Sequence, residues 1–233
     1  MNTVKYPFTH LVAHHKCGTP FEYIIEILPK CSPNGPWIAG GSLLRTYTGK
    51  PLDTDVDVFF QSKEQVDKFI TDITENSYKG IDEDRKQNHY RVHSSTVNDW
   101  HTTILLNYMQ REWKIQCVSF VHFKDISELF DSFDFNVCMM AYDGANIFVE
   151  ETTFAAITNK KIKLMKINYP SVTFKRLVKY MRQGYDVSDD DVVILTKSLK
   201  GAVEPRNILD VRFGIDGAGK SSSRKSDYRA LRP

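Results

Sequence analysis

The stretch that most constrains the fold of this chain covers residues 37–60 and joins a glycine-serine corner to two closely spaced carboxylates. A short apolar segment leads into Gly-Gly-Ser at 40–42, and Asp-Val-Asp-Val follows at 55–58. Side chains two apart on a strand share a face, so Asp55 and Asp57 point the same way while the valines point into the core. The stretch therefore predicts two strands, the second of which presents a pair of carboxylates on one face.

This arrangement suits a phosphorylated ligand that carries a divalent cation. Two carboxylates on one face are hard oxygen ligands for Mg²⁺ or Mn²⁺. The corner at Gly40, Gly41 and Ser42 opens a short helix, whose first N–H groups and serine hydroxyl are available to an anion. We therefore expect the corner to contact the phosphates of a nucleoside triphosphate, while Asp55 and Asp57 hold its metal. The alternative is an acidic hairpin on a solvated edge.

The same stretch resembles the signature of the DNA polymerase β nucleotidyltransferase superfamily. That signature is a small residue, Gly-Gly or Gly-Ser, thirteen residues, and then alternating acidic and apolar residues, as found at 39–41 and 55–58. Leu43-Leu44-Arg45 resembles the Val-Arg-Asp segment of tRNA nucleotidyltransferases and bacterial poly(A) polymerases, which adds Arg45 to the expected nucleotide site. The resemblance implies an α/β (α+β) fold, in which a small mixed sheet is backed by helices and followed by a short helical extension.

One expected strand departs from the family pattern. Members of the superfamily carry a third metal-binding carboxylate on a strand that resembles residues 113–120, and Gln116 takes its place here. An amide offers one oxygen to a metal but adds no charge. We therefore include Gln116 in the predicted catalytic set, and expect a site that either binds its metals more weakly or relies on the substrate phosphates.

Two later segments resemble the nucleotide-contacting parts of the same enzymes. Residues 133–142 resemble their ribose-recognising segment, with Asp134 in the matching place, although a core strand ending in a hairpin turn explains most of the apolar residues equally well. The helix expected over 171–183 resembles the family helix that faces the triphosphate. Its matching positions include Arg176, Lys179 and Tyr180. A basic helix face is more often merely solvated, which is the competing interpretation.

Helix and strand signals account for most of the remaining chain. Capping boxes at Thr19 and Ser62 each begin a helix, and Ser188 caps a last helix that runs to about Lys200. Residues 1–18 are expected to form a loop or a short element with solvated histidines. Further strands of the same sheet are expected within 89–123 and at 147–150. The expected buried stripe of the 171–183 helix is Phe174, Leu177, Val178 and Met181.

Composition narrows the classes of protein that remain. The chain has 233 residues and a formal charge of +2, yet residues 160–182 carry eight Lys and Arg side chains and no acid. No apolar run approaches the ~20 residues of a membrane span, and no signal-peptide core is present, so we expect a soluble, cytoplasmic protein without a membrane partner. The four cysteines are widely spaced, which predicts reduced thiols.

The expected organisation has three regions: a catalytic domain over 1–150, a neck-like helical extension over 151–204 and a flexible basic tail over 205–233. Residues 214–221 fit the P-loop formula, but too little sequence follows them for the parallel sheet that such a loop requires. We therefore interpret them as part of the tail.

Together these features predict a transferase that moves a nucleoside monophosphate from an NTP to a hydroxyl, with Mg²⁺ or Mn²⁺ as cofactor. The acceptor stays open, because an RNA or tRNA 3′ end, a protein hydroxyl and a small molecule all suit the chemistry. Two alternatives are a nucleotide- or RNA-binding protein that kept the fold and lost catalysis, and a scaffold protein. Gln116 favours the first of these. The sequence leaves the oligomeric state open.

Overall fold

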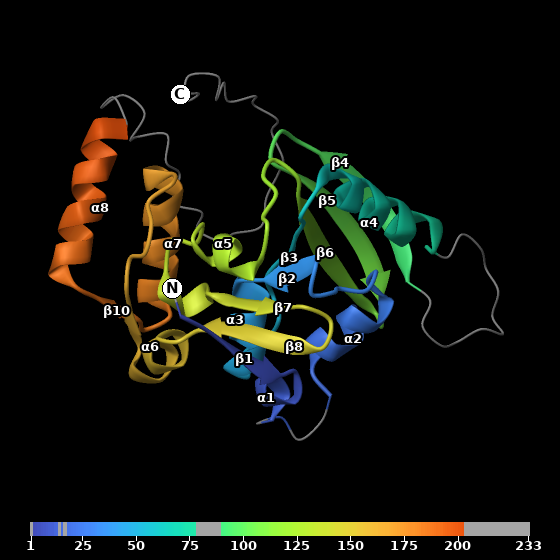
Figure 1. The fold of residues 1–233 in the computed structure, drawn as a ribbon, viewed down its shortest axis with the longest axis horizontal. Coiled ribbons are helices and arrows are strands. Elements are labelled where there is room, and N and C mark those ends of the chain that lie inside the picture. The colour runs from blue at the N-terminus through green and yellow to red at the C-terminus, as the bar shows by residue number, and fades with distance from the viewer. Residues whose placement is uncertain (1, 14, 16–17, 78–89, 203–233) are drawn as a thin grey trace.

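The computed structural model describes residues 2–13, 15, 18–77 and 90–202. It contains a mixed eight-stranded sheet in the order β1-β8-β7-β2-β3-β6-β5-β4 (Figure 1). The strands of this sheet are β1 (Thr3–Pro7), β2 (Trp37–Ala39), β3 (Val56–Phe59), β4 (Arg91–Val97), β5 (His101–Tyr108), β6 (Arg111–Val118), β7 (Met140–Tyr142) and β8 (Asn146–Glu150). A separate two-stranded sheet pairs β9 (Lys161–Ile162) with β10 (Asp186–Val187).

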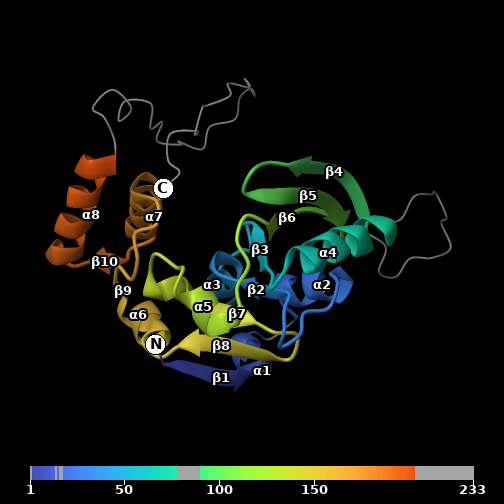
Figure 2. The ribbon, with the colours of Figure 1, turned by 45° about the horizontal axis from the view of Figure 1, so that its top comes forward.

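Helices cover both faces of the sheet and extend beyond one end of it (Figures 1 and 2). They are α1 (Thr9–Val12), α2 (Pro20–Ile27), α3 (Gly41–Tyr47), α4 (Lys63–Glu75), α5 (Ile126–Phe130), the 3-10 turn η1 (Asn136–Cys138), α6 (Thr153–Asn159), α7 (Pro170–Arg182) and α8 (Asp189–Ala202). α7 and α8 lie side by side, away from β4 and β5, in both views.

The strand register decides which residues meet. Strands β3 and β6 pair in parallel, with Asp57 opposite Gln116. The other neighbouring pairs of this sheet are antiparallel, and Ala39 of β2 lies opposite Asp57. The Gly40–Gly41 corner that follows β2 therefore lies beside the beginning of β3. Asp57, Gln116 and Ala39 share one face of the sheet, which we call the front face.

The opposite side, the back face, carries the larger apolar core. Side chains of α2, α3 and α4 pack there against alternate strand residues, including Ile38, Val58 and Ile115. On the front face a smaller core forms where α5 covers β2 and β7, with Trp37 at its centre. The front faces of β3, β6 and β5 are more polar, with Asp57, Gln116 and Thr103 in register. The sheet thus has one face built for packing and one that exposes polar groups.

The capping predictions agree with the structure. Thr19 accepts a bond from the Glu22 N–H, and the Glu22 carboxylate accepts one from the Thr19 N–H. Ser62 accepts from the Gln65 N–H at the start of α4. Residues 1–18 contain short elements, as we expected, but we did not expect that one of them, β1, forms an edge strand antiparallel to β8. That pairing is tertiary, and nothing in the local sequence marks it.

The buried stripe of α7 differs from the predicted one at its C-terminal end. Leu177 is buried and Phe174 is half-buried, but Met181 is 50% exposed while Tyr180 is buried. The Tyr180 ring packs edge to face against Phe135 from the segment before η1, which turns the helix toward Tyr180. The prediction for Met181 was therefore wrong.

The structure tests the predicted fold but not the predicted division of the chain into regions. The expected mixed sheet with helices and a C-terminal helical extension is confirmed, although the sheet, with eight strands among the described residues, is larger than the small sheet that we expected. The division between 1–150 and 151–204 stays a prediction, and the proposed tail at 205–233 lies outside the described residues. No helix within the described ranges is long and apolar enough to cross a membrane.

Candidate nucleotide and metal site

The site begins at the corner between β2 and α3. Gly40 has φ +88° and ψ −135°, a conformation that side-chain-bearing residues rarely adopt. A Cβ at this position would meet nothing within 4 Å, so backbone conformation and not space requires glycine. A Cβ on Gly41 would lie 3.7 Å from the Thr54 hydroxyl oxygen. The corner is therefore adjacent to the residue that precedes Asp55.

The structure places the two neighbouring predicted residues in supporting positions. Ser42 is fully buried, and its hydroxyl has no hydrogen-bond partner among the described residues. Arg45 forms an ion pair with Asp53 at 2.7 Å and donates to the Pro51 carbonyl at 3.2 Å. Arg45 thus braces the loop that leads into Asp55.

Asp57 is the carboxylate with the most unusual environment. It is only partly exposed, and desolvation by the surrounding protein raises its pKa from 3.8 to about 7, with a further contribution from the Asp55 carboxylate. Arg176, Lys114 and Lys179 oppose this shift. Near neutral pH the Asp57 carboxyl is therefore poised between its protonated and ionised forms, and two basic residues of α7 lie close enough to influence it.

Asp55 has a partner that the sequence reasoning did not include. The Lys114 ammonium of β6 donates to its carboxylate at 3.0 Å. The parallel pairing of Val56 with Ile115 brings the preceding residues, Asp55 and Lys114, side by side. Lys114 lies two residues before Gln116 and thus on the same face, a signal that becomes useful only once the register of β3 and β6 is known.

Asp134 and Arg176 come together although they lie far apart in the sequence. The Arg176 guanidinium donates to the Asp134 carboxylate at 2.6 Å, and Asp134 is 5% exposed. The Asp134 carbonyl also accepts from the Met165 N–H at 2.8 Å. Two residues predicted to contact the nucleotide thus tie α7 to the segment that precedes η1.

The remaining predicted residues of α7 point in different directions. Lys179 is exposed and lies near enough to lower the pKa of Asp57. Tyr180 is buried between the rings of Phe135 and Tyr185, with centroid distances of 5.7 and 5.8 Å. The structure therefore brings Arg176 and Lys179 toward the carboxylates and places Tyr180 in the core.

The donor set on the front face suits a divalent cation of hard character. Asp55, Asp57 and Gln116 offer two carboxylates and one amide oxygen, which are ligands for Mg²⁺ or Mn²⁺. Among the described residues no group of three or more His, Cys, Asp or Glu side chains could hold a metal ion together. The Lys114 ammonium lies 3.0 Å from the Asp55 carboxylate and already partly offsets the charge of that group.

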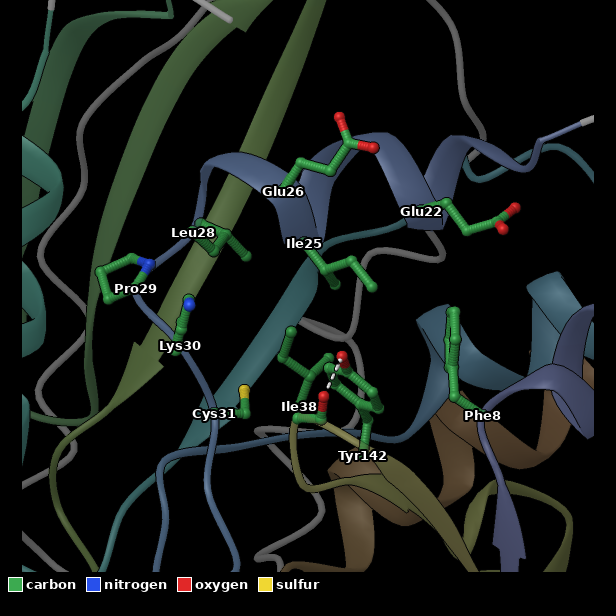
Figure 3. Close-up of a pocket in the computed structure, with 11 residues that line it drawn as sticks. Phe8, Glu22, Ile25, Glu26, Leu28, Pro29, Lys30, Cys31, Ile38 and Tyr142 are labelled. Carbon is green, nitrogen blue, oxygen red and sulfur yellow. Dashed lines mark hydrogen bonds between the residues drawn. The ribbon is translucent and has the colours of Figure 1, made fainter.

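Apart from this site, a hollow of about 460 Å³ lies on the back face under α2 (Figure 3). Ile38 and Tyr142 form its floor, while the carboxylates of Glu22 and Glu26 point away from them. Burial raises the pKa of the Cys31 thiol in its wall to about 12, so this cysteine is a weak nucleophile. The back hollow offers no chemistry comparable to that of the front face.

The chain matches a described family and a curated relative. Residues 18–160 match the family described as "Gabija anti-defense 2 family protein". The relative, Gabija anti-defense 2 of Bacillus phage SPbetaL7, is 26% identical over 177 residues, which cover 74% of this chain and 38% of the relative. This chain thus spans well under half the length of that relative.

Solved structures with a similar fold are CCA-adding enzymes. The Thermotoga maritima CCA-adding enzyme complexed with tRNA has a TM-score of 0.56 at 10% identity, over 85% of this chain and 46% of that one. A CCA-adding enzyme in complex with CTP has a TM-score of 0.54 at 10% identity, with the same coverage of both chains. This chain therefore spans about half of those enzymes. At such low identity the likeness shows the fold alone, and it confirms the predicted nucleotidyltransferase fold.

Proposed function

This chain belongs to the Gabija anti-defense 2 family, and we propose that it is a nucleotidyltransferase that moves a nucleoside monophosphate from an NTP to a hydroxyl acceptor. The observation that carries the proposal is the close approach of the Gly40–Gly41 corner to Asp55 and Asp57 within a nucleotidyltransferase fold. Backbone N–H groups that can donate hydrogen bonds to phosphate lie there beside two carboxylates that can bind a cation, as an NTP with its cation needs.

Different residues of this chain are proposed to bind the triphosphate and to accept a proton. The N–H groups at the start of α3 lack intrahelical acceptors and suit the triphosphate oxygens. Lys179 and Arg176 on α7 add positive charge on the side that faces Asp57. Asp57 is also proposed to accept the proton that the acceptor hydroxyl loses.

Asp55 and Asp57, with the Gln116 amide, would hold Mg²⁺ or Mn²⁺, which supplies charge neutralisation for the triphosphate. Gly40, Gly41 and Ser42 are proposed to line the phosphate subsite, with Arg45 and Asp134 holding the surrounding loops in place. Pyrophosphate is the leaving group, because the bond that breaks joins the α-phosphorus to the bridging oxygen of the β-phosphate.

The test is a labelling experiment with the purified chain. Each α-labelled NTP is incubated with Mg²⁺ or Mn²⁺, with and without RNA and with a cell extract from a Bacillus host. We expect label in one macromolecular or small-molecule fraction, and its loss in Asp57→Asn. Asp67→Asn, which changes an exposed aspartate on α4, is the matched control and should label as wild type does. Equal labelling by both variants would contradict the proposed site.

A second candidate function, nucleotide or RNA binding without catalysis, is favoured by one observation. Lys114 already neutralises Asp55, and Gln116 stands where a third carboxylate is expected, so the cation site carries less negative charge than the family pattern implies. A binding protein would hold NTP or RNA without releasing pyrophosphate. The relative's name suggests that either activity counters Gabija defence, and we infer the same role for this chain.

Expression in cells that carry Gabija distinguishes the two candidates. If transfer is required, Asp57→Asn should fail to restore phage growth while Asp67→Asn restores it. Full restoration by Asp57→Asn, with the protein present at wild-type level, would favour the binding function.

A further inference from the structure

Three large aromatic side chains meet at one end of the front face and remain partly exposed. Trp100 lies in the β4–β5 turn, Phe120 lies just beyond β6, and Tyr169 directly precedes α7. Their exposed fractions are 39%, 47% and 41%. The Trp100 ring lies 4.9 Å from that of Phe120 and 5.4 Å from that of Tyr169. We call these three residues the aromatic cluster.

The aromatic cluster is not part of the packing that holds the fold together. None of its members belongs to either of the two buried cores formed by the described residues. The rings meet at interplanar angles of 73° and 86°, so both contacts are edge to face and neither is a parallel stack. Large apolar groups that gather on a surface in this way mark a binding site more often than chance exposure does.

The backbone holds Trp100 and Phe120 in place. The Trp100 N–H donates to the Asn98 side chain at 2.8 Å, and its carbonyl accepts from Ser119 and Phe120 at 3.1 and 3.3 Å. The Tyr169 carbonyl accepts the Thr173 N–H at 2.9 Å in the first turn of α7. The rings are therefore presented by fixed backbone and need little ordering when a ligand arrives.

The position of the cluster connects it with the proposed transfer site. Alternate residues along β6 share the front face, so Val118 follows Gln116 away from Asp57, and Phe120 lies two residues beyond the end of the strand. Four residues at the rise of a strand correspond to roughly 13 Å. In both views α7 stands across from β4 and β5, and the contact between Trp100 and Tyr169 joins the two sides (Figures 1 and 2).

The charge near the cluster favours a polyanion over a protein surface of mixed charge. Tyr169 lies within 160–182, the segment with eight basic residues and no acid. Lys166 and Lys175, which flank it, are exposed. Acidic side chains also lie nearby: Asp99 is next to Trp100 in the turn, Asp134 pairs with Arg176, and Asp191 accepts from the Leu164 N–H.

We propose that the aromatic cluster binds unpaired bases of a single-stranded nucleic acid, whose phosphates follow the basic segment at 160–182. Base stacking on aromatic rings is available to every base, and basic side chains track the backbone, a combination typical of single-strand binding. Because the cluster lies on the same face as Asp57, the bound strand is also the acceptor whose terminal hydroxyl reaches the carboxylates. This last step rests on the function proposed above, whereas the binding step does not.

The test measures binding of labelled single-stranded RNA, single-stranded DNA and duplex DNA to the full chain by fluorescence anisotropy. We expect either single strand to bind more tightly than the duplex, and Trp100→Ala to weaken single-strand binding by about 10-fold or more. Trp100→Phe should retain most of the affinity because it keeps a ring. Met109→Ala is the matched control, since Met109 is 58% exposed in the β5–β6 turn at the opposite end of these strands.

The preference between RNA and DNA identifies which strand is the ligand. Equal loss for Trp100→Ala and Met109→Ala, tighter duplex binding, or no nucleic-acid binding by any variant would overturn the proposal. The last of these outcomes is expected if the cluster contacts a protein instead. Circular dichroism verifies that Trp100→Ala remains folded.

Failure of this proposal is distinguishable from failure of the proposed function. If the chain transfers label from an NTP but binds no single strand, the transferase proposal stands and the aromatic cluster has no part in it. If the chain binds a single strand through Trp100 but transfers no label, the binding proposal stands and the transferase proposal fails.

Discussion

Strands β3 and β6 are neighbours in the sheet, run in parallel and place alternate side chains on the same front face, yet their charges differ in sign. β3 and the residue before it contribute Asp55 and Asp57, whereas β6 contributes Lys114 and Gln116. The first strand follows the superfamily pattern, and the second departs from it at Gln116. The family pattern implies three acids on this face, and here one of the three is an amide while a lysine offsets another.

This difference has a direct electrostatic consequence. The Lys114 ammonium lies 3.0 Å from the Asp55 carboxylate, so it competes with a cation for the oxygens of that carboxylate. Asp57 has no such partner at hydrogen-bonding distance among the described side chains, and its pKa rises to about 7. The two carboxylates therefore differ: Asp55 is held in an ion pair, and Asp57 is a group that gains and loses a proton near neutral pH.

The largest expected effect comes from removing the charge on β3. Asp57→Asn should lower NTP transfer by about 1000-fold, because it removes both a cation ligand and the proposed proton acceptor, which together are worth roughly 4 kcal/mol of transition-state stabilisation. Turnover with α-labelled NTP measures the loss. Asp67→Asn should transfer at the wild-type rate. A wild-type rate for Asp57→Asn would mean that β3 takes no part in the reaction.

The contrast between these strands also explains how far the sequence could predict the site. The Gly40 corner and the Asp55–Asp57 alternation are local patterns, and local spacing alone brings them onto one face. The role of Lys114 depends on the register between β3 and β6, which are separated by an entire helix and two strands. Gln116 was included in the predicted site only through the family resemblance; the register places it opposite Asp57, and its function stays a prediction.

The same reasoning applies to α7. Helical periodicity correctly indicated that Leu177 is buried, but it could not indicate that the Phe135 ring draws Tyr180 inward and leaves Met181 exposed. The aromatic cluster was missed for a similar reason, because Trp100, Phe120 and Tyr169 are isolated in sequence. The missed features are therefore those created by contacts between distant segments.

A second prediction concerns stability, where Asp57 and Asp134 should respond in opposite ways. The folded pKa of Asp57 lies above its ordinary value, so its favourable contribution is complete below about pH 4 and is lost as the pH rises to about 7. Asp57→Asn should therefore raise the free energy of unfolding at pH 8 by on the order of 2 kcal/mol and change it little at pH 4. Urea denaturation in the presence of a chelator measures both values.

Asp134→Asn provides the contrast for that prediction. It leaves Arg176 without its carboxylate partner, and we expect a loss of about 1–2 kcal/mol at pH 7, a moderate value because Arg176 is 57% exposed. If Asp57→Asn instead destabilises the protein at pH 8 as much as Asp134→Asn does, then the raised pKa of Asp57 is not what distinguishes β3 from β6.

A third prediction tests the charge that β6 supplies. Lys114→Gln should tighten Mn²⁺ binding by roughly fivefold, because it frees Asp55 from an ion pair of 3.0 Å, although partial exposure of both groups limits the gain. Isothermal titration calorimetry measures the affinity. Lys68→Gln, which breaks a Lys–Asp pair of 2.7 Å on α4, is the matched control. An unchanged affinity for Lys114→Gln would mean that the cation does not use Asp55.

The smallest expected effect is that of making β6 follow the superfamily pattern at Gln116. Gln116→Glu places a third carboxylate opposite Asp57 and should tighten Mn²⁺ binding by about two- to threefold at pH 7. The gain is limited because the added negative charge also raises the pKa of Asp57 further, so that a proton competes with the cation. At a pH above 8 that competition weakens, and the advantage of the variant over wild type should grow. In the double variant with Lys114→Gln the two gains should not be additive, since both act on the same cation through adjacent carboxylates. Calorimetric titrations at the two pH values measure these differences, and an affinity independent of both pH and substitution would place the Gln116 side chain outside the cation site.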